Sequence, residues 1–131
     1  MNGKTIYLDT HAVVWLYSGD LHLFSKEGIQ LIEDNDLLIS PIVLLELQYL
    51  AEIKRITAEP TLIFDSLSES VGLRKCRASF AQVIAESMRM SWTRDPFDRI
   101  ITATAAVNQA VLLTKDEKIR QAYSLAFWDG I

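Results

Sequence analysis

Four carboxylates, Asp9, Glu46, Asp98 and Asp116, lie where a parallel α/β fold would gather them. Asp9 and Asp116 each follow a short apolar run that is typical of a buried strand. Asp98 falls in the first turn of a predicted helix, so its side chain points back toward the start of that helix. Glu46 has apolar residues at every helical spacing around it, where an ionised side chain is costly unless it is paired.

Each of the four also has an ordinary structural explanation. Asp9 and Asp116 could simply cap the helices that follow them. Asp98 is favourably placed beside a helix N-terminus whatever its function. Glu46 could reach the surface or pair with an arginine. For each residue alone, the sequence leaves both explanations open.

Taken together, the four carboxylates predict a metal site. The carboxyl ends of parallel strands and the helix N-termini that follow them meet at one edge of such a sheet. Four ionised carboxylates at that edge need a counter-charge, and Mg²⁺ or Mn²⁺ is the kind of hard cation that prefers oxygen ligands. Because such a cation can activate water and neutralise a phosphate, we expect phosphodiester hydrolysis.

Five neighbouring residues are candidates for supporting roles. Thr10 and Thr114 could orient a carboxylate or a water molecule, or could serve only as hydrogen-bonding groups at helix ends. Asp95 precedes a proline and is interpreted mainly as a helix cap. Arg94 and Arg99 could contact the phosphates of a substrate. Alternatively, the two arginines only balance the charge of nearby acidic residues, and we favour this interpretation for Arg99.

Other side chains capable of chemistry are interpreted as structural. His11 has no evident nucleophile to serve, and His22 falls in a predicted surface loop. Trp15 and Trp128 are expected in the core or in an interface rather than as platforms for bases. A basic cluster is interpreted as a solvated face, and it comprises Arg74, Lys75 and Arg77.

Short apolar runs alternate with longer helical patterns, which is typical of βαβ crossovers. This order predicts an α/β fold with a mainly parallel central sheet of about four to five strands and helices on both faces. Ser25, Ser40-Pro41 and Asp95-Pro96 mark helix starts. Strands are predicted at residues 5–8, 37–39, 71–75, 110–113 and 125–128. Helices are predicted at residues 10–18, 26–33, 41–53, 79–90, 96–108 and 117–123, with another after Pro60.

Length and composition limit the classes of protein. The chain of 131 residues fits one domain, 1–131, and 50% hydrophobic residues exclude general disorder. The longest uncharged run, 100–114, is too short and too polar to span a membrane. The single cysteine, Cys76, excludes an internal disulfide, and we expect a cytoplasmic protein. The net charge of −4 argues against a broad nucleic-acid surface unless several carboxylates share one pocket.

Four segments, in this order and spacing, resemble the successive motifs of PIN-domain proteins, most of all the VapC-like toxins of bacterial type II toxin–antitoxin systems. They are residues 7–12, Ser40-Pro41 followed by Glu46, residues 94–101 and residues 113–116. The resemblance implies a Mg²⁺-dependent ribonuclease, usually dimeric, that a cognate antitoxin holds inactive. It carries the family's acidic residues over to the four carboxylates already singled out.

Two departures from the family pattern bear on substrate preference: Trp92 stands where relatives often have a histidine, and Thr104 replaces a frequent glutamine. A phosphoacceptor receiver domain is an alternative, but it needs paired acids at the end of the first strand and leaves Glu46 without a role. A dehalogenase-type phosphatase needs an acid where this chain has His11. A nucleotide-binding fold needs a glycine-rich loop that is missing. A non-catalytic PIN-like binding module also remains open, although the complete acidic set disfavours it.

Overall fold

Five short parallel strands form the central sheet of the computed structural model, which describes residues 4–129. The strand order is β3-β2-β1-β4-β5, and every neighbouring pair is parallel. The strands are β1 (Thr5–Leu8), β2 (Asp36–Ile39), β3 (Arg74–Lys75), β4 (Val111–Leu113) and β5 (Ala126–Phe127). The predicted α/β class, the parallel sheet and its strand number are thereby confirmed.

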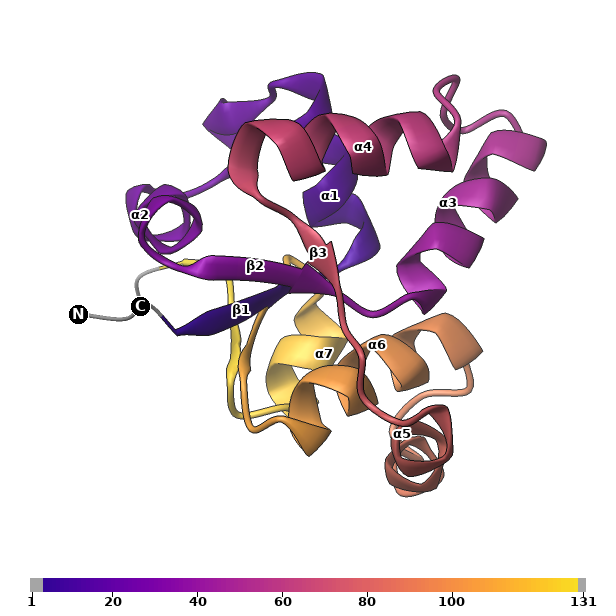
Figure 1. Cartoon of the computed structure of the whole chain (residues 1–131). Coiled ribbons are helices and arrows are strands. Elements are labelled where there is room, and N and C mark those ends of the chain that lie inside the picture. Colours follow the sequence, from indigo (N-terminus) through magenta and orange to yellow (C-terminus); the bar gives the residue numbers. More distant parts are fainter. Residues whose placement is uncertain (1–3, 130–131) are drawn as a thin grey trace.

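Helices cover both faces of the sheet (Figure 1). Within residues 4–129 they are α1 (Thr10–Ser18), the 3₁₀ helix η1 (Leu21–Leu23), α2 (Lys26–Asp34), α3 (Ile42–Glu52), α4 (Pro60–Val71), α5 (Phe80–Ser87), α6 (Pro96–Val107) and α7 (Glu117–Ala122). Figure 1 shows α1, α2 and α4 on one face and α5, α6 and α7 on the other, while α3 contacts both α1 and α6. No helix in this part of the chain is long and apolar enough to cross a membrane.

The central strands β2, β1 and β4 are largely buried between the two helical layers. Both residues of the edge strand β3 are exposed. Ile6 and Leu8 of β1 are almost completely buried, and Leu37, Leu112 and Leu113 of the neighbouring strands are equally inaccessible. The short apolar runs of the sequence are therefore continuous core rather than alternating half-exposed strands.

The helix starts follow the predicted signals closely. Ser25, Asp95 and Asp116 each accept hydrogen bonds from backbone amides of the helix that they precede. Helix α3 begins one residue later than predicted, although Pro41 already has helical backbone angles (φ −54°, ψ −24°). Pro41 is the cap residue of α3 and no side chain caps this helix, so the predicted Ser40 cap is wrong. The Ser40 hydroxyl accepts the Ile42 amide only at 3.4 Å.

Two predicted boundaries are wrong. Strand β3 does not begin at Val71, because that residue still belongs to α4 and Gly72 ends the helix in the left-handed conformation (φ 72°). Helix α5 ends at Ser87 rather than at Met90. There the chain tightens into a turn in which the Met90 amide donates to the Ser87 carbonyl at 3.1 Å, and this turn buries Met90.

The topology creates one crevice at the carboxyl edge of the sheet. From β1 the chain continues over one face toward β2, whereas from β4 it continues over the other face toward β5. β1 and β4 are neighbours, so the order of connections reverses between them, and this is where α/β sheets place their sites. The Asp9 amide donates to the Leu113 carbonyl at 3.2 Å, which joins the ends of these two strands.

Candidate functional site

A cleft of about 500 Å³ opens at this crevice and is lined by five carboxylates: Asp9, Glu46, Asp95, Asp98 and Asp116. They come from the end of β1, from α3, from the start of α6 and from the loop after β4. All four carboxylates singled out in the sequence are therefore brought together, and Asp95 joins them.

Asp9 is both a helix cap and part of the cleft. Its side chain is only 6% exposed. One carboxylate oxygen accepts the Ala12 amide at 2.9 Å, and the other accepts a short hydrogen bond from the Thr114 hydroxyl. Burial raises the pKa of Asp9 above its ordinary value, while the bonds from Thr114 and Ala12 act in the opposite direction.

Glu46 is held from α1. The Thr10 hydroxyl donates to Glu46 Oε1 at 2.5 Å, which joins α1 to α3 across the cleft. Burial raises the pKa of Glu46, and this hydrogen bond opposes the shift. An arginine partner, one of the alternatives for Glu46, does not occur among the ion pairs of residues 4–129.

The pKa of Asp98 shows most clearly how crowded the negative charges are. Burial first, and then the charges of Asp95, Asp116, Glu46 and Asp9, raise its pKa to about 7. Asp95 itself is exposed and caps α6, with one oxygen that accepts the amides of Phe97 at 2.8 Å and Asp98 at 3.2 Å. The cleft thus holds more carboxylates than can ionise together without a counter-charge.

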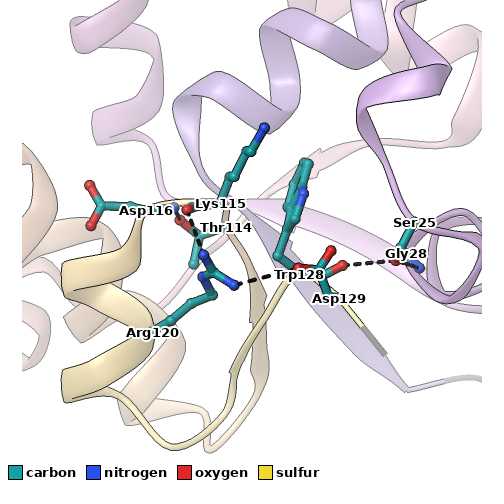
Figure 2. Close-up of polar contacts among 8 residues, drawn as sticks. All are labelled: Ser25, Gly28, Thr114, Lys115, Asp116, Arg120, Trp128 and Asp129. Carbon is teal, nitrogen blue, oxygen red and sulfur yellow. Dashed lines mark hydrogen bonds and ion pairs between the residues drawn. The ribbon is translucent and has the colours of Figure 1, made fainter. Parts of the chain in front are cut away.

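The loop between β4 and α7 carries the fifth carboxylate, and Figure 2 shows how it is fastened. The Thr114 hydroxyl accepts the Asp116 amide at 3.1 Å, and Asp116 accepts the Ile119 amide at 3.0 Å as the cap of α7. Arg120 donates to the Lys115 carbonyl at 3.2 Å (Figure 2). The expected helix-end hydrogen bonding of Thr114 is present, and so is its contact with Asp9.

The two arginines near the acidic segment each donate a hydrogen bond to a backbone carbonyl of the loop before α6. Arg94 is exposed and donates to the Ser91 carbonyl at 3.0 Å, while Arg99 donates from Nε to the Thr93 carbonyl at 2.8 Å. Within residues 4–129 neither forms an ion pair with a carboxylate. The charge-balance interpretation of Arg99 is therefore wrong, because this side chain stabilises the loop before α6 instead.

Three lining residues were missed as site residues: His11, Trp15 and Lys115. His11 was interpreted as structural, yet it is exposed in the cleft, and its charge opposes the raised pKa values of Asp9 and Glu46. Trp15 packs against the core, as expected, but also lines the cleft. The spacing of four residues from His11 to Trp15 on a predicted helix was the signal that places both on one face.

A divalent cation fits this donor set by its chemistry, because every donor is a carboxylate oxygen and the cleft is crowded with negative charge. In the part of the chain that the structure describes, however, no three His, Cys, Asp or Glu side chains are close enough to hold a metal ion together. Hydrogen bonds from α1 hold Asp9 and Glu46, and one from α7 holds Asp116.

Fold and cleft together define a PIN domain, and the chain belongs to the PIN domain family, which it matches over residues 6–125. It is 36% identical over 119 residues to Ribonuclease VapC22 of Mycobacterium tuberculosis, an alignment that covers 88% of this chain and 90% of that protein. Family membership is confirmed, and the receiver, dehalogenase and nucleotide-binding alternatives are excluded.

Solved structures of low sequence identity share the fold. A toxin–antitoxin complex from Klebsiella pneumoniae has a chain with a TM-score of 0.62 and 21% identity, covering 93% of this chain and 95% of that one. VapBC2 from Rickettsia felis, bound to a DNA fragment from its promoter, has a chain with a TM-score of 0.61 and 20% identity, covering 95% and 98%.

Proposed function

We propose that this chain is a divalent-metal-dependent endoribonuclease that hydrolyses RNA phosphodiesters, and that it is the toxin of a type II toxin–antitoxin pair. The observation that carries the proposal is the convergence of five carboxylates on the crevice of a PIN fold. The name of its 36% identical relative, a ribonuclease, supports the same activity. Residues 1–131 then act as a single PIN domain.

Asp9, Glu46, Asp98 and Asp116 would hold the cation, Mg²⁺ or Mn²⁺. When bound, it supplies a counter-charge for the carboxylates and Lewis-acid chemistry for a phosphodiester. Thr114 and Ala12 hold the two oxygens of Asp9, and Thr10 holds Oε1 of Glu46. Each carboxylate oxygen has two lone pairs, so these bonds orient the carboxylates and leave acceptor capacity for a ligand.

Water is the proposed nucleophile. Ribonucleases that work without a metal commonly use a pair of histidines, whereas this chain has only His11 and His22. Of these only His11 lines the cleft, and Thr10, the hydroxyl-bearing residue of the lining, is bonded to Glu46.

The proposal is tested by cleavage of a single-stranded RNA oligonucleotide with and without metal. We expect cleavage with Mg²⁺ or Mn²⁺, none with excess EDTA, and none by Asp98→Asn. Asp65→Asn, a change of an exposed aspartate on α4, is the matched control and should cleave normally. A rise in melting temperature with added Mg²⁺ that is lost in Asp98→Asn gives a second readout. Equal cleavage in excess EDTA would contradict the metal mechanism.

A cognate antitoxin is the proposed regulatory partner. Chains of similar fold occur in toxin–antitoxin complexes, and an acidic cleft suits a partner segment that presents an arginine. A guanidinium can pair with carboxylates in bidentate geometry and so compete with a cation. Replacing that arginine by methionine in the antitoxin encoded beside this gene should weaken neutralisation. Unchanged neutralisation would leave only steric blocking of RNA.

We further propose that the protein works as a homodimer in the cytoplasm, where RNA is present. Apolar side chains of α3 and α5, among them Leu45 at 56% and Phe80 at 71% exposure, line one groove and favour self-association. Light scattering measures the mass directly. A monomer at micromolar concentration would contradict the dimer.

A further inference from the structure

The cleft has a second group of lining residues that the carboxylates do not explain. His11 and Trp15 lie one turn apart on α1, and Lys115 lies in the loop after β4. The ring centroids of His11 and Trp15 are 5.7 Å apart, and the Lys115 ammonium is 5.8 Å from the centre of the Trp15 ring. We call these three residues the aromatic wall.

Trp128 holds the Trp15 ring of the aromatic wall in place. Trp15 packs edge-on against Trp128, with ring centroids 5.6 Å apart and an angle of 68° between the rings. The Trp128 carbonyl accepts the Ser25 hydroxyl at 2.8 Å, and in Figure 2 the side chains of Trp128 and Lys115 extend in the same direction. Because Trp128 holds Trp15, the Trp15 ring loses little conformational entropy when a ligand binds to it.

The polar ends of the wall are free for a ligand. Lys115 lies beside five carboxylates, yet among residues 4–129 it forms no ion pair within 4.0 Å and no side-chain hydrogen bond. His11 is likewise exposed, and no side-chain hydrogen bond joins it to another described residue. An ammonium that has no carboxylate partner and lies over an aromatic ring supplies the positive charge and the aromatic surface that proteins use for single-stranded nucleic acid.

We propose that the aromatic wall holds an unpaired nucleotide next to the scissile phosphodiester, with the base on His11 and Trp15 and a neighbouring phosphate on Lys115. This inference rests on the proposed ribonuclease function. The wall then selects single-stranded or looped RNA, because the faces of bases inside a duplex are covered by their neighbours. It also supplies the positive charge that a phosphate backbone needs to enter an otherwise acidic cleft.

Kinetics of two exposed variants test the wall. We expect His11→Ala and Lys115→Ala each to raise KM for a single-stranded RNA by about tenfold, with kcat changed by less than about threefold. Matched controls are His22→Ala and Lys118→Ala, which alter exposed residues that do not line the cleft. Trp15→Leu removes the aromatic face but keeps apolar bulk, and its melting curve shows whether it remains folded.

A second experiment identifies the base that contacts the wall. Abasic substitutions are placed one at a time on either side of the mapped cleavage position. One abasic substitution should raise KM of the wild type by about tenfold. The same substitution should raise KM of His11→Ala only a little further, because the abasic RNA and the His11→Ala change remove the same contact. A separate loss in both proteins would overturn the assignment of His11.

Binding without cleavage isolates the contribution of Lys115. In an Asp98→Asn background, RNA affinity is measured as a function of salt concentration. Loss of one phosphate contact should reduce the slope of log K against log salt by about 0.7 for Lys115→Ala, with no change for Lys118→Ala.

The failures of the two proposals are distinguishable. If the wild type cleaves RNA and the wall variants keep its KM and its salt slope, the aromatic wall is overturned and the ribonuclease stands. A fall in kcat at constant KM would mean that these residues act on the carboxylates, which also overturns the wall. If the wild type cleaves no RNA, the proposed function fails, and the salt slope in the Asp98→Asn background still decides whether Lys115 contacts RNA.

Discussion

Crowding of like charge governs the chemistry of the individual residues in the cleft. Asp98 is only partly buried, yet its pKa is raised to about 7 by that burial and by four neighbouring carboxylates. The folded chain therefore holds its carboxylates together at a cost that either a proton or a cation removes. Both remedies act at the same place, so stability, pH and metal binding are linked.

The pH dependence of stability follows from this shift. The pKa of Asp98 is higher in the folded than in the unfolded chain, so between about pH 4 and about pH 7 the metal-free folded protein binds more protons. Its stability therefore falls as the pH rises through this range, and the penalty is complete above about pH 7. Asp9 and Glu46 also have raised pKa values, so we expect Asp98→Asn to weaken this trend rather than abolish it. The same change should raise the melting temperature of EDTA-treated protein at about pH 8 by about 3 °C.

The same variant should lose cleavage activity by about 100-fold or more, because a ligand of the proposed cation is missing. Asp95→Asn is the control, since asparagine also caps a helix and Asp95 is not a proposed ligand. Melting curves at several pH values and cleavage rates check both. Equal damage from the two changes would contradict the separate roles assigned to Asp95 and Asp98.

Two buried threonines form a matched pair for a second prediction. The Thr114 hydroxyl serves both Asp9 and the Asp116 amide, so Thr114→Val should cost about 2 kcal/mol of stability and reduce cleavage. The Thr102 hydroxyl is buried and has no partner in the described chain, so Thr102→Val should cost nothing or stabilise. Urea denaturation measures both variants, and an equal cost for both would contradict the proposed role of Thr114.

At the scale of the elements, the helix caps position the site. Asp9, Asp95 and Asp116 each cap a helix and also line the cleft. Capping and site formation are therefore not alternatives, because a helix N-terminus at the carboxyl edge of the sheet directs its cap toward the same crevice. The capping bonds also keep these carboxylates in place while their charges repel one another.

Helix α2 gives a prediction at this scale. The Ser25 hydroxyl accepts the Gly28 amide at 3.0 Å and donates to the Trp128 carbonyl, so it joins α2 to the end of β5 (Figure 2). Ser25→Ala should cost about 1–2 kcal/mol, whereas Ser79→Ala at the exposed start of α5 removes only one long bond of 3.3 Å and should cost about 0.5 kcal/mol. Thermal or urea unfolding compares the two, and a larger cost for Ser79→Ala would contradict the joining role of Ser25.

At the scale of the whole molecule, the neighbouring positions of β1 and β4 decide where the cleft of carboxylates lies. The two strands end beside each other, and helices from both faces deliver their N-termini to that point. The cleft is consequently built from segments spread over most of the chain. Such a site forms only when the sheet is complete, so we expect its carboxylate crowding to vanish on unfolding.

The ends of the RNA products report on the whole mechanism. When water attacks phosphorus and the bond to the 3′-oxygen breaks, the 3′-oxygen takes a proton, and the products carry a 5′-phosphate and a 3′-hydroxyl without use of the RNA 2′-hydroxyl. We therefore expect a 2′-deoxy substitution at the scissile nucleotide to weaken binding without abolishing cleavage. Mapping the ends of a cleaved oligonucleotide checks this. A 2′,3′-cyclic phosphate would contradict hydrolysis by water and would point to His11 as a catalyst.

The sequence alone determined the order of helices and strands, most of the caps that begin the helices, and which acidic residues lie at the strand ends. These features depend on residues within a few positions of one another, as in Asp95-Pro96, where the aspartate accepts amides two and three residues away. Interactions between residues this close in the sequence can be predicted from the sequence itself. The positions of Asp9, Glu46, Asp98 and Asp116 in one cleft could therefore be predicted from it.

Only the tertiary structure decided which side chains meet. Thr10 bonds to Glu46, 36 residues away in the sequence, because α1 contacts α3. Thr114 bonds to Asp9, 105 residues away, because β1 lies beside β4. The same packing brings Lys115 over Trp15 and turns Arg99 to a loop carbonyl instead of a carboxylate. Such pairings depend on how whole helices and strands pack against one another. Hydrophobic burial drives this packing, and because it is not directional, the sequence near each residue does not show which distant residue it will contact.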